Sequence, residues 1–192
     1  MTAYQNYTYA GEPEAEKTVS AMLQQISGEL VKTLGQSSIR SLVLLGGYGK
    51  GEGGLVKTAN NGFKPHNNFD LLLVAPNDQR RAIEALNESA ETVLEHLRKD
   101  LGMGIDLSIV TEGKLRGMPT RVLWYDMREG HRTIFGDGTL VPSIPHTLEN
   151  VPAWDMRNLM VNRGTLLLIN RLCQMDVGDD INGHEGLKRL MI

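Results

Sequence analysis

A cluster of glycines directly after an apolar run is the feature that most constrains the fold of this chain. Five of the seven residues 39–45 are apolar, and five of the eight residues from Gly47 to Gly54 are glycine. A short apolar run that ends at glycine is typical of a buried strand. Glycine is kept where φ is positive or where the backbone approaches another group closely. At the end of a strand that group is commonly a phosphate, so the pattern predicts a strand followed by a phosphate-binding loop.

Two further apolar segments each carry one carboxylate near their start. Residues 68–74 contain Asp70, and residues 104–110 contain Asp106. If both segments are strands, we expect the glycine loop and the two carboxylates to converge on one cleft. Carboxylates hold Mg²⁺, which in turn neutralises phosphates and activates an attacking hydroxyl. This combination indicates nucleotidyl transfer, in which an NMP passes from an NTP to an acceptor.

Three better-known glycine motifs do not fit. Gly49-x-Gly51-x-x-Gly54 matches the dinucleotide fingerprint, but that motif must open a helix, and residues 55–67 contain Asn60-Asn61-Gly62 and Pro65. Its ribose-binding acid also belongs at the far end of the second strand, whereas Asp70 begins one. No Gly-Lys-Ser/Thr follows the glycines, which excludes a P-loop, and the strand and loop motifs of a protein kinase are absent from the sequence.

The remaining pattern predicts an α/β fold, with a small mixed, twisted sheet, helices on one face and a C-terminal helical segment. We expect a helix from Pro13 to a stop at Gly35, and a hairpin-type connection over residues 55–67. A second helix follows Pro76, with Asn77 or Asp78 as its cap, and ends at Gly102.

The last third of the chain is harder to assign. Residues 119–128 fit a helix, although residues 121–125 fit a strand equally well; residues 133–137 indicate a short strand and turn, and residues 155–175 a helix. We therefore expect a loose N-terminus (residues 1–12), one main domain (13–141) and a linker with a C-terminal helical segment (142–192).

Composition narrows the class of protein. The net charge is −3 with a pI near 6.0, which does not favour a long nucleic acid as substrate. Cys173 is alone, so neither a disulfide framework nor a cysteine zinc site is expected. No apolar run is long enough for a membrane span and no signal peptide is recognisable, so we expect a cytoplasmic protein with no membrane partner.

The sequence resembles the DNA-polymerase-beta-like nucleotidyltransferases. Their signature is an apolar strand, Gly-Gly or Gly-Ser, a spacer, Asp-x-Asp on the next strand, and a third Asp beyond the following helix. More narrowly, residues 46–53 read Gly-Gly-Tyr-Gly-Lys-Gly-Glu-Gly, as in a bacterial subgroup whose loop has Gly-Gly-Tyr/Phe-Gly-Arg/Lys-Gly-Glu-Gly. The turn at Gly136-Asp137 and the pair Asn162-Arg163 also resemble that subgroup. The likeness covers roughly residues 15–172.

The resemblance implies a set of site residues. Mg²⁺ or Mn²⁺ would be held by Asn68, Asp70 and Asp106, with Asp106 also the base for the incoming hydroxyl. The NTP would be bound by Gly46, Gly47, Tyr48, Gly49, Lys50, Glu52 and Arg163. The sequence departs from the family at one place, because Asn68 stands where the first Asp of Asp-x-Asp belongs. An amide oxygen can bind Mg²⁺ but brings no charge.

The sequence thus favours a Mg²⁺-dependent nucleotidyltransferase whose acceptor is the hydroxyl of a small molecule or a protein. The alternative, motivated by Asn68, is a catalytically degenerate domain of the same fold that binds nucleotide or a protein partner. A homodimer is compatible with both. The sequence does not identify the acceptor or the preferred NTP.

Overall fold

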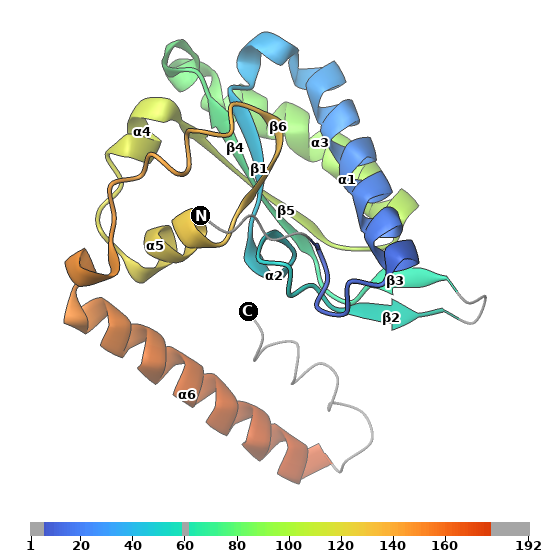
Figure 1. Cartoon of the computed structure of the whole chain (residues 1–192), viewed down its shortest axis with the longest axis vertical. Helices are drawn as coiled ribbons and strands as arrows, with labels where there is room; N and C mark the ends of the chain where they lie inside the picture. Colours follow the sequence, from blue (N-terminus) through green and yellow to red (C-terminus); the bar gives the residue numbers. More distant parts are fainter. Residues whose placement is uncertain (1–5, 59–61, 178–192) are drawn as a thin grey trace. The chain divides into compact units, whose positions relative to one another are not determined.

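The computed structural model describes residues 6–58 and 62–177 (Figure 1). Its α-helices are α1 (Pro13–Leu34), α2 (Gly46–Gly49), α3 (Ile83–Leu101), α4 (Glu112–Arg116), α5 (Val122–Glu129) and α6 (Ala153–Val177). Short 3-10 helices are η1 (Gln36–Ser38), η2 (Asn77–Ala82) and η3 (Leu148–Asn150). The strands are β1 (Ser41–Leu44), β2 (Leu55–Lys57), β3 (Phe63–Pro65), β4 (Phe69–Ala75), β5 (Ile105–Thr111) and β6 (Arg132–Gly136). The chain divides into two compact units, residues 1–118 with 126–145 and residues 119–125 with 146–192.

The first unit is built on a mixed sheet with strand order β5-β4-β1-β6. Strands β4 and β5 are parallel, as expected for strands joined through a helix, here α3. Strand β1 runs antiparallel to both β4 and β6. The connection over residues 55–67 contains the antiparallel pair β2 and β3, as the sequence predicts. The predicted α/β class with a small mixed sheet is confirmed.

Helices α1 and α3 pack on one face of this sheet (Figure 1). Apolar residues at three- and four-residue spacing form the buried stripe of each helix. They meet the alternate residues of the strands that point to the same face. The centre of this core consists of Val19, Leu23, Ile26, Leu30, Leu42, Leu44, Phe69, Leu71, Leu73, Leu94 and Ile105. Since Phe69 and Leu71 point into this core, Asp70 between them points to the opposite face.

The ends of the two long helices show which local signals determined them. Pro13 begins α1, where a missing N–H costs nothing, and Gly35 ends it with a φ of 80°. Gly102 ends α3 in the left-handed conformation with a φ of 62°. The predicted cap of the second helix differs. Helix α3 has no side-chain cap, and the Oδ1 of Asn77 instead accepts a hydrogen bond from Gly113 N–H at 2.7 Å, in the first turn of α4.

Residues 6–12 differ from the loose segment that the sequence predicts. Thr8 is buried, with 2% of its surface exposed, and forms a β-bridge with Gly53. The carboxylate of Glu16 on α1 accepts hydrogen bonds from this segment. The segment is therefore held against the first unit by contacts with residues distant in sequence.

In the second unit, residues before α5 contact the start of α6. Asp155 accepts a hydrogen bond from Val122 N–H at 2.8 Å, the first residue of α5, and its other oxygen lies 3.3 Å from the Arg121 guanidinium. That guanidinium stacks over the Trp154 ring at 4.1 Å. Of the two alternatives for residues 119–128, the helix is confirmed. None of the helices in the described part of the chain is long and apolar enough to cross a membrane.

Candidate active site

Asp70 and Asp106 lie side by side at the start of the two parallel strands. In the register of β4 and β5, Asp70 is the direct partner of Asp106. Partners in a parallel ladder point to the same face of the sheet, so both carboxylates lie on the face opposite to α1 and α3. Asp70 is half-buried and Asp106, on the outer strand, is exposed. The structure thus brings together the two carboxylates that the sequence selects.

Asn68 joins these two carboxylates through its side-chain amide. It precedes Asp70 by two residues, which places it on the same face. Its Nδ2 lies 3.2 Å from Asp70 Oδ1 and also donates a short hydrogen bond to Asp106 Oδ2. An ionised carboxylate only accepts hydrogen bonds, so the amide must present its NH₂ group to both. Asn68 therefore provides a neutral bridge between two like charges.

The electrostatics of the pair show why such a bridge is needed. Burial, and secondarily the neighbouring Asp106 charge, raise the pKa of Asp70 above its usual value. Both effects disfavour the ionised carboxylate. A cation bound between the two groups would relieve this cost, as the amide hydrogens relieve part of it here.

The glycine loop begins directly beside Asp70. Leu45 N–H donates to the Asp70 carbonyl at 2.8 Å, and Gly46 follows with a φ of 62°. A Cβ at Gly46 would collide with Asp70 Oδ2, and one at Gly49 would lie 2.6 Å from the Leu44 carbonyl oxygen. Residues Gly46–Gly49 form the single turn of α2, and the first N–H groups of a helical turn have no partner within it. The two glycines are thus required by close packing against the carboxylate and strand β1.

Tyr48 supports the loop from beneath. Only 3% of it is exposed, and its ring packs edge-on against Phe69 with centroids 4.9 Å apart. Its hydroxyl donates to the Gly54 carbonyl at 2.5 Å, and burial raises the pKa of that hydroxyl. Tyr48 is therefore a core residue that ties the two ends of the loop together, in a position that does not offer its ring to a base.

Three other side chains are expected to bind nucleotide, those of Lys50, Glu52 and Arg163, and their surroundings in the structure differ. Lys50 forms an ion pair with Asp126 on α5 at 2.6 Å, and a Cβ at Gly130 would collide with its methylene chain. Glu52 is exposed on the loop. Arg163 lies on α6, in the second unit. For Glu52 and Arg163 a role in nucleotide binding stays a prediction, and Lys50 would have to leave Asp126 to reach a phosphate.

Sequence reasoning missed one residue next to the pair. Arg98 on α3 donates from Nε at 2.9 Å and from Nη2 at 2.6 Å to the carbonyl of Ile105, the residue before Asp106. It also forms an ion pair with Glu91, seven residues and about two turns earlier. The guanidinium thereby fixes the start of the outer strand and places a positive charge near Asp106. Its only sequence signal is a basic residue in the last turn of α3.

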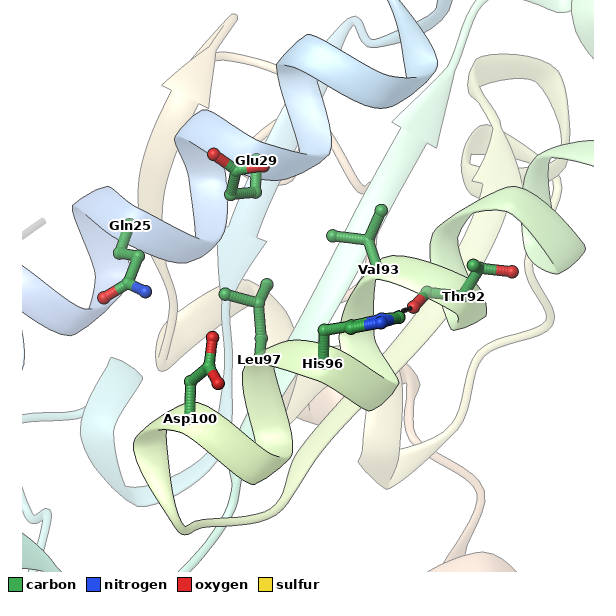
Figure 2. A pocket seen from close by; sticks show the side chains of 7 residues that line it. All are labelled: Gln25, Glu29, Thr92, Val93, His96, Leu97 and Asp100. Carbon is green, nitrogen blue, oxygen red and sulfur yellow. Dashed lines mark hydrogen bonds between the residues drawn. The ribbon is translucent and has the colours of Figure 1, made fainter.

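A separate groove lies between α1 and α3 (Figure 2). It has a volume of about 420 Å³ and is lined by Gln25, Glu29, Thr92, Val93, His96, Leu97 and Asp100. These helices cover the face of the sheet opposite to Asp70 and Asp106. The groove is therefore not part of the carboxylate site.

Comparisons with known proteins give distant structural matches. No protein-family model and no curated protein matches the sequence. The spectinomycin adenyltransferase of an Enterococcus, solved with ATP and spectinomycin, is 14% identical over 74% of this chain and 66% of its own, with a TM-score of 0.42. Two mutants of the toxin–antitoxin MntA–HpeT are 15% and 14% identical, over 78% and 79% of this chain and 97% and 98% of theirs, with TM-scores of 0.36 and 0.37. This chain spans about two thirds of the length of the adenyltransferase. With identities of 14–15% and TM-scores of at most 0.42, these matches carry no argument about function, which rests on the geometry of the site.

Proposed function

We propose that this chain is a nucleotidyltransferase that binds an NTP beside the glycine loop and transfers its NMP to an acceptor hydroxyl. The observation that carries the proposal is the packing of Gly46 directly against Asp70, whose partner across the parallel ladder is Asp106. The main-chain N–H groups of the first turn of α2, which have no partner within that turn, thus lie beside a pair of carboxylates. Phosphate and divalent cation are the two parts of a metal–NTP complex.

The residues present fit a Mg²⁺ or Mn²⁺ ion that arrives with its nucleotide. Among the described residues no three His, Cys, Asp or Glu side chains gather into a metal site. Mg²⁺, however, is usually held by one or two carboxylates together with substrate phosphates and water. Asp70 and Asp106 supply the two carboxylates, and the carbonyl oxygen of Asn68 can serve as a neutral third ligand. When bound, the ion would neutralise the phosphates and polarise the α-phosphate.

The proposal gives each of the chain's own groups a role. The N–H groups of Gly46 and Gly47 bind the β- and γ-phosphates, and Tyr48 keeps the loop in shape from the core. Asp106, the more exposed carboxylate, accepts the proton of the acceptor hydroxyl. The hydroxyl oxygen bonds to the α-phosphorus and the bond to pyrophosphate breaks. The acceptor is a small molecule or a protein hydroxyl, because the chain carries a net charge of −3 that does not favour a long nucleic acid.

Isothermal titration calorimetry tests the proposal. Each of the four NTPs is titrated into the protein with Mg²⁺, with Mn²⁺ and with EDTA. We expect metal-dependent heat with at least one NTP, which Asp70→Asn abolishes. Asp100→Asn is the matched control, since it removes the same charge from an exposed position on α3. No heat with any NTP and either metal would refute the proposal. An NTP that binds would then be used with an α-phosphate label to find the acceptor.

A further inference from the structure

The described N-terminal segment, residues 6–11, forms a strap across the second half of the glycine loop. Gly53 N–H donates to the Tyr7 carbonyl at 3.1 Å, and Tyr9 N–H donates to the Gly53 carbonyl at 3.2 Å. Both backbone groups of Gly53 are therefore used by the strap. A Cβ at Gly53 would collide with the Tyr48 ring and lie 2.7 Å from the Tyr7 carbonyl oxygen. The loop is thus held between the strap on one side and Tyr48 on the other.

The strap is itself fixed by one carboxylate. Glu16 on α1 accepts hydrogen bonds from Tyr7 N–H at 2.6 Å, from Thr8 N–H at 2.9 Å and from the Thr8 hydroxyl at 2.5 Å. The Thr8 hydroxyl oxygen in turn accepts from Gly11 N–H at 3.2 Å. Hydrogen bonds to an ionised acceptor are about twice as strong as neutral ones. A single side chain therefore satisfies three donors of the strap.

A second anchor holds the other end of the strap. Arg132 on β6 donates from Nη2 to the Asn6 carbonyl at 2.7 Å, and its guanidinium stacks on the Tyr7 ring at 4.1 Å. Strand β6 pairs with β1, which leads into the glycine loop. The strap therefore joins helix α1 and strand β6 to the glycine loop.

We propose that Glu16 is a positioning residue of the glycine loop, acting through the strap. Glu16 fixes Tyr7 and Thr8, and Tyr7 in turn fixes Gly53 by its hydrogen bond. The preceding residue, Glu52, donates its N–H to the Gly47 carbonyl at 2.7 Å. This bond connects the second half of the loop to the half beside Asp70. The role in nucleotide binding rests on the proposed function. The holding of the loop does not, and it can be measured without any ligand.

The test is amide hydrogen exchange of Glu16→Gln, followed by NMR. One of the two acceptor oxygens becomes an NH₂ group, which cannot accept the hydrogen bond from Tyr7 N–H or from Thr8 N–H that it faces, while the size of the side chain is kept. Glu14→Gln is the matched control, because it removes the same charge from the same first turn of α1 at an exposed position. Thr8→Val is a second variant, which replaces the hydroxyl by a methyl group and so removes its hydrogen bonds to Glu16 and from Gly11. Urea denaturation measures any loss of global stability in each variant. The amides of β1 serve as the internal reference for that loss in the exchange experiment.

We expect the amides of Tyr9, Glu52 and Gly53 to exchange about tenfold faster in Glu16→Gln and in Thr8→Val than in the unmodified protein. In Glu14→Gln their exchange rates should not change. The NTP dissociation constant should rise about tenfold in the same two variants. Exchange in Glu16→Gln equal to that in Glu14→Gln would overturn the inference. Faster exchange with unchanged affinity would overturn the positioning role in binding. Absence of NTP binding in the unmodified protein would instead refute the proposed function, and the exchange result would still decide whether Glu16 holds the loop.

Discussion

Asn68→Asp restores a charge at the centre of the site and should destabilise the protein when no cation is present. The asparagine amide donates two hydrogen bonds, to Asp70 and to Asp106. Hydrogen bonds to charged groups contribute about 1.5–3 kcal/mol each. Because Asp106 is exposed and Asp70 only half-buried, we take about 1 kcal/mol for each bond, so their loss costs about 2 kcal/mol.

The added carboxylate also repels its neighbours. It would lie where Nδ2 now lies, 3.2 Å from Asp70 Oδ1. Two charges at about 4 Å interact by about 1 kcal/mol in water and about 4 kcal/mol at a protein surface of effective dielectric constant near 20. For a partly exposed site we take about 1–2 kcal/mol. The total is about 3–4 kcal/mol, which corresponds to a drop in Tm of roughly 10 °C for a chain of this size.

Thermal and urea denaturation in EDTA at pH 7 measure this effect. The control is Asn87→Asp, which makes the same chemical change at an exposed position on α3 and should alter stability by less than about 0.5 kcal/mol. Mg²⁺ is then added to both variants. A cation that binds the three carboxylates of the folded state restores about 2.7 kcal/mol when its concentration is about 100 times its dissociation constant.

Two results would refute this reasoning. If Asn68→Asp is as stable as Asn87→Asp in EDTA, the amide contributes nothing to the carboxylate pair. If Asn68→Asp is destabilised but Mg²⁺ restores no stability, the cluster does not bind the cation even with a third carboxylate. That second result would favour a domain without nucleotidyl transfer.

Two further predictions concern the same site and its loop. Folding raises the pKa of Asp70 above its usual value of 3.8. Between that value and the higher pKa of the folded state, the native state binds more protons than the unfolded state. The free energy of unfolding should therefore fall as pH rises from the usual pKa through the folded-state pKa. Asp70→Asn should remove this fall. In urea denaturation between pH 3 and 7, the free energy of unfolding of the variant should rise relative to that of the unmodified protein as pH increases. Parallel pH profiles of the two proteins would contradict the prediction. Gly53→Ala should destabilise the protein by about 2 kcal/mol, because its Cβ collides with the Tyr48 ring and approaches the Tyr7 carbonyl oxygen. Gly28→Ala, in α1 with no atom within 4 Å of the new Cβ, should stabilise it by up to about 1 kcal/mol; equal effects of the two alanines on the urea midpoint would refute the packing argument.

Local signals predicted much of this fold. Pro13, Gly35 and Gly102 mark helix ends by backbone conformation alone, and the apolar runs mark strands β1, β4 and β5. The pairing of Asp70 with Asp106 followed from the position of each acid near the start of its strand, since parallel strands of equal length place equal positions together. These features depend on neighbours in sequence or on simple topology.

The features that the sequence did not predict depend on contacts between distant residues. Nothing near Thr8 indicates that it pairs with Gly53, because the segment is polar and lacks a strand pattern. Asn77 has the composition of a helix cap, yet its side chain contacts Gly113, 36 residues away. The sequence predicts that Lys50 binds phosphate, whereas in the structure it forms an ion pair with Asp126, 76 residues away. In each case the partner lies far away in the sequence, so no local pattern could indicate the contact.

An amide at position 68 can serve the site in two states, which an aspartate cannot do. Without a cation, its NH₂ group bridges two carboxylates that would otherwise repel each other. With a cation, a half-turn of the same amide presents a carbonyl oxygen, a neutral ligand that Mg²⁺ accepts. Aspartate would bind the cation more strongly but leave the empty site with three like charges. We therefore expect Asn68→Asp to lower stability in EDTA and to raise affinity for Mg²⁺ at once. A substitution that merely damages the fold would lower both, so the opposite signs distinguish the two explanations.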